Sequence, residues 1–203
     1  YIAPVLFRLR LTPNVLTLIG VILTGGVAIV LANGRLFLGG WLLVFASIFD
    51  LFDGAVARTT NQTSTFGAFF DSIMDRYSEA IVFLGLLVYF HQLDAAQSLQ
   101  GIMLVYVAII GSLMVSYARA RAEGLNIACE TGWLGRPERL AILCTGLVFG
   151  FLTIALWILA ILTNFTAIQR IYHVWKHEQL ANPELKPKTA RRPLFGFFVR
   201  PEK

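Results

Sequence analysis

Long apolar stretches make up most of the chain and are separated by short polar segments. They are Val15–Ala32, Leu36–Phe52, Phe66–Phe90, Ile102–Tyr117, Leu140–Phe149 and Phe151–Ile168. A membrane-spanning helix needs roughly 20 predominantly apolar residues, although about 17 can suffice. The pattern therefore predicts an all-α integral membrane protein with six transmembrane helices, preceded by a short N-terminal juxtamembrane helix.

Two connections between these stretches are short. Asn33-Gly34 predicts a tight turn from the first span into the second. The segment from Arg136 to Arg170 is too long for one span, because a single helix over it would exceed the thickness of the hydrocarbon core. We therefore expect a hairpin that turns near Gly150 and has two short legs.

Composition and charge place these spans in a membrane with a defined orientation. The 203 residues are 57% hydrophobic and 14% charged, with a net charge of +5, and the mean hydropathy is +0.68. Of the 17 Lys and Arg residues, only Arg35 falls in a loop on the far side of the expected bundle. The positive-inside rule then predicts that both termini are cytoplasmic. We expect residues 1–177 to form a membrane domain in the cell (inner) membrane and residues 178–203 a basic cytoplasmic tail. A nucleic-acid partner is not expected, because no soluble basic face is present.

Four aspartates are expected to gather at the cytoplasmic ends of the second and third spans. Asp50 and Asp53 end one span, and Asp71 and Asp75 lie near the start of the next. Separations of three and four residues put each pair on one helix face. Carboxylates beside hydrocarbon repel one another unless a cation lies between them. Hard oxygen ligands suit Mg²⁺ or Mn²⁺, and two such ions form a common clamp in phosphoryl chemistry. A single aspartate would be a helix cap or a surface charge, whereas four indicate a metal site.

Small residues and one arginine flank the aspartates. Gly54, Ala57 and Gly67 are either helix-packing contacts or positions that let a base and a diphosphate approach the backbone. Arg58 either pairs with a phosphate or extends to the membrane interface.

Glu79 continues the Asp71–Asp75 stripe one turn further along the helix. It would either orient a ligand from behind or form a salt bridge with Arg76 or another basic neighbour, and the sequence leaves both possibilities open.

The stretch Asp50–Asp75 has the pattern D-x-x-D-G-x-x-A-R, eight residues, then G-x-x-x-D-x-x-x-D. It resembles the signature of the CDP-alcohol phosphotransferase family, with every motif position occupied. The resemblance implies a six-helix membrane enzyme, typically a homodimer, that displaces CMP from a CDP-linked donor.

The resemblance also implies that Asp50, Asp53 and Asp71 hold two Mg²⁺ or Mn²⁺ ions. Asp75 would share a metal and act as the base that removes the acceptor's hydroxyl proton. The residues implied to contact the CDP-linked lipid are Asn14, Val15, Leu16, Thr17, Gly54, Ala57, Arg58, Ser64 and Gly67.

Three further segments are similar to the bacterial phosphatidylinositol-phosphate synthase branch of that family. They are Tyr117–Glu123 (Y-A-R-A-R-A-E), Arg136–Leu140 (R-P-E-R-L) and Gln169-Arg170. The similarity covers most of the chain and implies that basic residues grip the phosphate of inositol 1-phosphate. The residues concerned are Arg119, Arg121, Arg136, Arg139 and Arg170. The branch more often has Lys at the position of Arg119, and the hairpin here is shorter.

The arginines also have simpler interpretations. The positive-inside rule alone would place them on this face. Arg121 could pair with Glu123, and Arg139 with Glu138, without contacting any ligand.

The resemblance therefore implies phospholipid synthesis, in which CDP-diacylglycerol and inositol 1-phosphate give phosphatidylinositol phosphate and CMP. The same chemistry with glycerol 3-phosphate, or with an archaeal CDP-archaeol donor, is the first alternative. A divalent-cation transporter is a second, but its site would lie near the bilayer midplane between repeats, and no repeat is evident. A polyprenyl-transferring enzyme would also bind Mg²⁺ and diphosphate, but it does not explain the Gly-x-x-Ala-Arg insert.

Overall fold

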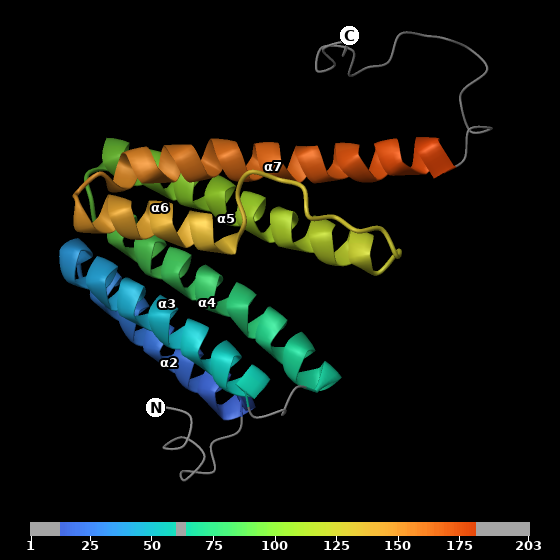
Figure 1. Cartoon of the computed structure of the whole chain (residues 1–203). Helices are drawn as coiled ribbons and strands as arrows, with labels where there is room; N and C mark the ends of the chain where they lie inside the picture. Colours follow the sequence, from blue (N-terminus) through green and yellow to red (C-terminus); the bar gives the residue numbers. More distant parts are fainter. Residues whose placement is uncertain (1–12, 60–63, 182–203) are drawn as a thin grey trace, which may run out of the picture.

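Six helices form the described part of the chain, which is a computed structural model of residues 13–59 and 64–181 (Figure 1). Residues 13, 49–59 and 181 are described by their helical backbone alone. The helices are α2 (Pro13–Ala32), α3 (Leu36–Thr59), α4 (Thr65–His91), α5 (Ala95–Glu123), α6 (Arg136–Val148) and α7 (Leu152–Ala181). The all-helical prediction is confirmed for these residues. The expected juxtamembrane helix and most of the expected tail lie outside them.

The two predicted turns are present, and each uses a glycine with left-handed backbone geometry. Gly34 (φ 76°) connects α2 to α3, and Gly150 (φ 77°) connects α6 to α7. Glycine adopts this conformation without the steric cost that a Cβ would bring. The prediction of two short legs is wrong for the second leg, because α6 has 13 residues and α7 has 30. At 1.5 Å per residue α7 is about 45 Å long, so it exceeds a hydrocarbon core of about 30 Å. It also continues through the boundary that we expected at residue 177.

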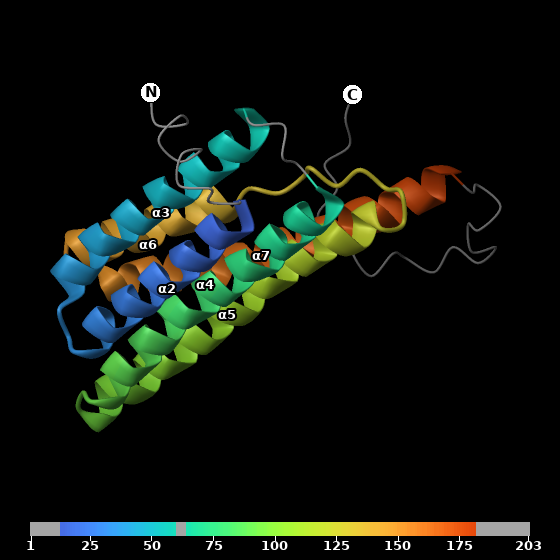
Figure 2. The same ribbon diagram turned by 90° about the horizontal axis from the view of Figure 1, so that it is seen from below.

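The helices pack as two groups, α2–α3–α4 and α5–α6–α7 (Figures 1 and 2). In the first group α2 contacts both α3 and α4, and in the second α7 contacts both α5 and α6. The groups meet where α4 packs on α5 and where α3 packs on α6. Helices α4 and α6 are not among the closely packed pairs of the described bundle, and residues of both line a cavity between the groups.

Glycines allow the closest approaches within each group. A Cβ at Gly85 of α4 would lie 2.5 Å from the backbone oxygen of Ala28 of α2. A Cβ at Gly111 of α5 would collide with Thr163 Oγ1 of α7. Small residues at helix contacts are typical of membrane bundles, where backbones must approach closely to gain packing energy.

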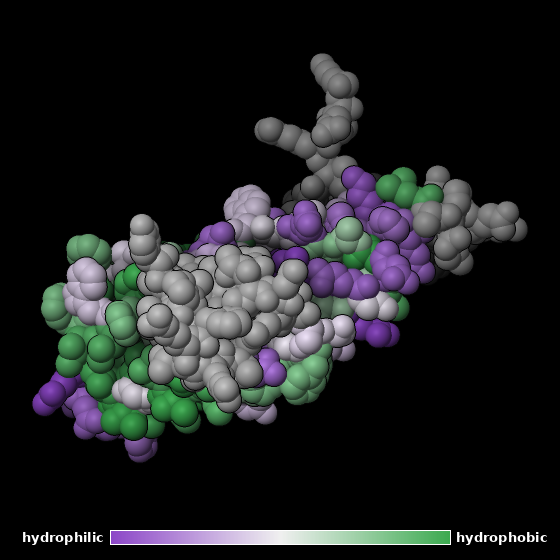
Figure 3. All heavy atoms as spheres, turned by 60° about the horizontal axis from the view of Figure 1, so that its bottom comes forward, coloured by the Kyte–Doolittle hydropathy of each residue, from purple (hydrophilic) through white to green (hydrophobic). Residues whose placement is uncertain are grey.

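The outer surface is strongly apolar. Three helical segments, Asn14–Ala32, Ala95–Glu123 and Leu152–Leu180, are long and apolar enough to cross a membrane. Figure 3 shows hydrophobic side chains over much of one face. It also shows hydrophilic side chains gathered toward the end where α5 and α7 extend furthest, with a smaller group at the opposite end. This distribution fits a protein embedded in lipid, with a polar end that carries the candidate site.

Candidate active site at the polar end of the bundle

The aspartates lie on α3 and α4 next to the short connection between them. Asp71 and Asp75 are one turn apart on α4 and are partly buried. Asp50 and Asp53 lie on the helical end of α3, and their side chains lie outside the description. Among the described residues, no group of three His, Cys, Asp or Glu side chains could hold a metal. The two described carboxylates fit a hard divalent cation as donors, and the four-aspartate cluster remains a prediction.

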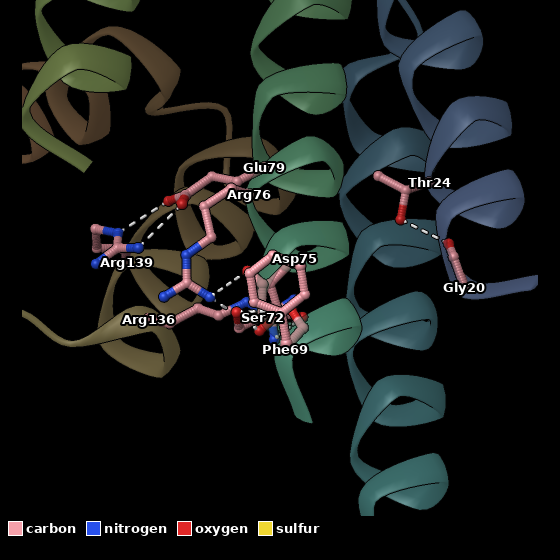
Figure 4. Close-up of polar contacts among 9 residues, drawn as sticks. All are labelled: Gly20, Thr24, Phe69, Ser72, Asp75, Arg76, Glu79, Arg136 and Arg139. Carbon is pink, nitrogen blue, oxygen red and sulfur yellow. Dashed lines mark hydrogen bonds and ion pairs between the residues drawn. The ribbon is translucent and has the colours of Figure 1, made fainter. Parts of the chain in front are cut away.

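Asp75 lies between two guanidinium groups (Figure 4). Arg136 Nη1 is 2.8 Å from Asp75 Oδ1, and Arg76 Nη1 is 3.6 Å from Asp75 Oδ2. Arg76 also donates a hydrogen bond of 2.6 Å to the backbone oxygen of Ser72, which fixes its side chain along α4. The Asp75 side chain is only 14% exposed. The expected base is thus held next to an arginine that we expected to bind phosphate.

Glu79 and Arg139 form a second ion pair one turn deeper (Figure 4). Arg139 donates through Nε (2.9 Å) and Nη2 (3.0 Å) to the two oxygens of the Glu79 carboxylate. The side chains are 3% and 9% exposed. The alternative expectation that Arg139 pairs with Glu138 is therefore wrong. Of the possibilities for Glu79, the salt bridge forms with Arg139 of α6 rather than with Arg76.

The other expected phosphate-binding arginines lie on α5 and α7. Arg170 is 5% exposed and donates to the backbone oxygens of Thr131 (2.9 Å) and Val115 (2.5 Å). Glu123 accepts a hydrogen bond of 2.8 Å from Arg119, not from Arg121 as we considered. Arg121 is exposed near the end of α5. The structure thus brings Arg136 to Asp75 and Arg139 one turn away, while convergence of all five arginines remains a prediction.

Three of the positions expected to contact the donor lie together at the start of α2 and α4. The N–H of Gly67 donates a hydrogen bond of 2.9 Å to Ser64 Oγ, which caps α4. A Cβ at Gly67 would lie 3.0 Å from Ser64 Oγ and 3.4 Å from Asn14 Oδ1. Polar groups from two helices therefore surround a position without a side chain.

The structure describes the side chains of only some of the other positions that we expected to contact the CDP-linked lipid. Leu16 and Thr17 are buried, and Val15 is exposed. The side chains of Gly54, Ala57 and Arg58 lie outside the described residues.

A cavity of about 40 Å³ lies between the two helix groups and is lined by Arg136 and by the Glu79–Arg139 pair. Its polar lining consists of Thr24, Ser47, Ser78, Glu79, Arg136 and Arg139. At roughly 10–15 Å³ of probe-occupied space per water molecule, it has room for a few waters. Thr24 and Ser47 were not expected at the site from the sequence. The only available signal was a hydroxyl side chain in an apolar stretch, and most such hydroxyls bond their own helix, as these two do.

Comparison with known proteins assigns the class of this site. The sequence matches the model of the CDP-alcohol phosphatidyltransferase family over residues 10–175. The chain therefore belongs to this family of enzymes, and the family resemblance of its aspartate motif is confirmed.

The relatives include an archaetidylinositol phosphate synthase and phosphatidylinositol phosphate synthases. The chain is 36% identical to the archaetidylinositol phosphate synthase of Methanothermobacter thermautotrophicus, over 87% of this chain and 89% of the relative. It is 35% identical to the phosphatidylinositol phosphate synthase of Mycobacterium tuberculosis, over 86% of this chain and 84% of the relative. The crystal structure of that mycobacterial enzyme with CDP-DAG bound aligns with a TM-score of 0.80 and 33% identity, covering 86% of this chain and 92% of the other. Its complex with manganese and citrate aligns with a TM-score of 0.79 and 34% identity, covering 86% and 87%.

Proposed function

We propose that this enzyme transfers the phosphatidyl group of CDP-diacylglycerol to a hydroxyl of inositol 1-phosphate, giving phosphatidylinositol phosphate and CMP. The observation that carries the proposal is the 2.8 Å contact between Asp75 and Arg136 beside the cavity. An acceptor of this reaction presents a hydroxyl that must lose its proton and a phosphate that needs a cation. A carboxylate and a guanidinium held together match both groups of such an acceptor.

The proposed acid–base step uses Asp75. Its carboxylate takes the proton from the acceptor hydroxyl, the oxygen bonds to the phosphorus of the phosphatidyl group, and the bond from that phosphorus to the CMP oxygen breaks. CMP then leaves with the electron pair of the broken bond. A base held within hydrogen-bonding distance of the reacting hydroxyl typically contributes about 10²–10⁴-fold to the rate.

The phosphate of the acceptor would be held by arginines. Arg136 exchanges its contact with Asp75 for the phosphate, and Arg139 contributes Nη1, which Glu79 does not engage. The other proposed contributors are Arg119, Arg121 and Arg170. Planar guanidinium groups bind phosphate oxygens with paired hydrogen bonds, so several arginines would fix its position.

Divalent ions would be held by Asp50, Asp53, Asp71 and Asp75. Bound Mg²⁺ or Mn²⁺ supplies positive charge that neutralises the diphosphate of the donor. The manganese complex of the mycobacterial relative supports this assignment. Asn14, Ser64 and Gly67 would contact the CDP-linked donor, together with the neighbouring positions Val15, Leu16, Thr17, Gly54, Ala57 and Arg58.

The six helices would all cross the membrane, with both termini and the active site on the cytoplasmic side of the cell membrane. Three described helical segments are long and apolar enough to span, and the positive-inside distribution of Lys and Arg supports the orientation. We propose a homodimer, as the family resemblance implies.

An alternative donor is supported by one comparison. The archaeal relative makes archaetidylinositol phosphate, so CDP-archaeol is an alternative donor. Glycerol 3-phosphate is an alternative acceptor, because it also carries a hydroxyl and a phosphate.

Purified enzyme in detergent tests these choices directly. CMP release is followed with each combination of CDP-diacylglycerol or CDP-archaeol and inositol 1-phosphate or glycerol 3-phosphate, in the presence of Mg²⁺ or Mn²⁺. We expect the highest kcat/KM with CDP-diacylglycerol and inositol 1-phosphate, and a phosphorylated lipid product. If CMP is released with glycerol 3-phosphate as the acceptor but not with inositol 1-phosphate, the proposed acceptor is refuted.

A further inference from the structure

The space between α4 and α6 is bridged by two ion pairs in register, and we refer to it as the α4–α6 gap. On α4 the carboxylates of Asp75 and Glu79 are four residues apart, and on α6 the guanidiniums of Arg136 and Arg139 are three residues apart. Both spacings place the two side chains on one face of a helix, one turn apart. Each carboxylate of one helix therefore meets one guanidinium of the other (Figure 4).

The two pairs differ in burial and in geometry. In the outer pair, Arg136 Nη1 is 2.8 Å from Asp75 Oδ1, and the side chains of Asp75 and Arg136 are 14% and 31% exposed. Glu79 and Arg139 share two hydrogen bonds and are almost completely buried. Water competes with an exposed pair but not with a buried one, and a buried charge that loses its partner is strongly unfavourable. The outer pair can therefore open for a ligand, whereas the inner pair stays closed.

The inner pair, Glu79 and Arg139, also links the start of α6 to α4. Helix α6 packs on α3 and α7, and α4 packs on α2 and α5, but α4 and α6 do not pack closely on each other. Arg139 is in the first turns of α6, three residues after Arg136. A bidentate guanidinium–carboxylate pair fixes both distance and direction, so it sets where the start of α6 lies relative to α4.

We propose that Glu79 is a positioning residue for the acceptor site: its bidentate hold on Arg139 fixes the start of α6, and thereby the placement of Arg136 beside Asp75. This inference rests on the proposed function, because it concerns the phosphate of the acceptor. Glu79 itself does not touch the reacting atoms. Its loss should weaken binding of the acceptor phosphate and leave binding of the CDP-linked donor unchanged.

The test compares Glu79→Gln with the matched control Glu138→Gln. Glu138 is exposed and lies next to Arg139 on α6, so the control makes the same chemical change outside the ion pair. KM for inositol 1-phosphate, KM for CDP-diacylglycerol and kcat are measured by CMP release.

For Glu79→Gln we expect KM for inositol 1-phosphate to rise by about tenfold to a hundredfold, the range for a weakened hydrogen bond to a charged group. We expect kcat and KM for CDP-diacylglycerol to change by less than about threefold, as for lost uniform binding of one substrate. All three constants should be unchanged in Glu138→Gln.

Two further variants separate positioning from loss of stability. Leu156→Ala removes a fully buried side chain of the core and should lower the melting temperature while leaving KM for inositol 1-phosphate unchanged. Glu79→Asp keeps the charge but shortens the side chain, so we expect partial rescue, with KM between those of the parent enzyme and Glu79→Gln. If Glu79→Gln does not fold, KM for inositol 1-phosphate is measured with Glu79→Asp instead.

The outcomes distinguish this inference from the proposed function. If the parent enzyme uses inositol 1-phosphate and both Glu79 variants keep its KM, the positioning role is refuted and the proposed function stands. The positioning role would also be refuted if Leu156→Ala raised KM for inositol 1-phosphate as much as Glu79→Gln does, for the same loss of melting temperature. If glycerol 3-phosphate is the acceptor, the same KM comparison is made with it. An enzyme that uses neither acceptor would overturn both proposals.

Discussion

The α4–α6 gap and the α5–α7 interface connect helices by opposite means. Across the gap, long charged side chains reach over a cavity and meet as two ion pairs. At the α5–α7 interface, Gly111 lies against Thr163, and Asn164 Nδ2 donates to the backbone oxygen of Val107 at 3.2 Å. Side chains there bond to backbone carbonyls, and the pocket between the two helices, which Met103 and Trp157 help to line, is mainly apolar.

This difference indicates a division of roles. An interface built from small residues lets the helix backbones pack closely and gives rigidity. Charged side chains around a cavity retain hydrogen-bonding capacity that a phosphate or a hydroxyl can use. Substitutions in the outer pair of the gap, Asp75 and Arg136, should therefore change catalysis more than stability, and substitutions in the interface should do the reverse.

The largest effect is expected for Asp75→Asn in the gap. The amide keeps the size of the side chain but cannot act as the base, so we expect kcat to fall by about 10²–10⁴-fold. Binding of CDP-diacylglycerol, measured by equilibrium dialysis, should remain largely intact. Full turnover in this variant would exclude Asp75 as the base.

The next effect is expected for Gly111→Ala in the α5–α7 interface. The added Cβ collides with Thr163 Oγ1, and overpacking of this kind costs about 1–3 kcal/mol. Thermal unfolding in detergent should show a lower melting temperature, while kcat/KM of the folded enzyme stays near that of the parent. Activity lost without a change in melting temperature would contradict the division of roles.

The smallest effect is expected for Glu123→Gln, which removes the partner of Arg119 outside both regions. The two side chains are 50% and 51% exposed, and a surface pair of this kind contributes about 0.3–0.5 kcal/mol. The melting temperature should therefore hardly change. A loss of stability as large as that of Gly111→Ala would show that this end of α5 matters more than its exposure indicates.

Hydrophobic periodicity predicted the helices well but not their ends. The Asn33-Gly34 dipeptide and the length of the Arg136–Arg170 segment predicted turns that the structure places at Gly34 and Gly150. However, α5 continues past Tyr117 to Glu123, and α7 past Ile168 to Ala181. Alanine, arginine, glutamate and glutamine favour helix in water as well as in lipid. Apolar runs therefore mark spans rather than helix boundaries.

The local part of the site could be predicted, and its long-range part could not. The four-residue spacing places Asp71 and Asp75 on one face of α4, because helix geometry alone determines it. The Glu79–Arg139 pair joins residues that are 60 positions apart. Nearer partners of opposite charge, Glu138 and Arg76, are available to each, so sequence proximity gave the wrong choice. The pair depends on the tertiary arrangement of α4 and α6, which no spacing along the chain specifies.

The central claim is that Asp50, Asp53, Asp71 and Asp75 lie together because divalent ions bind among them. Titration of the purified enzyme with Mn²⁺, followed by the electron paramagnetic resonance signal of free Mn²⁺, tests it without requiring turnover. We predict uptake of about two ions per chain, as in two-metal phosphoryl-transfer sites, competition by Mg²⁺, and weaker uptake by Asp71→Asn. A free Mn²⁺ signal that the enzyme leaves unchanged would contradict the account.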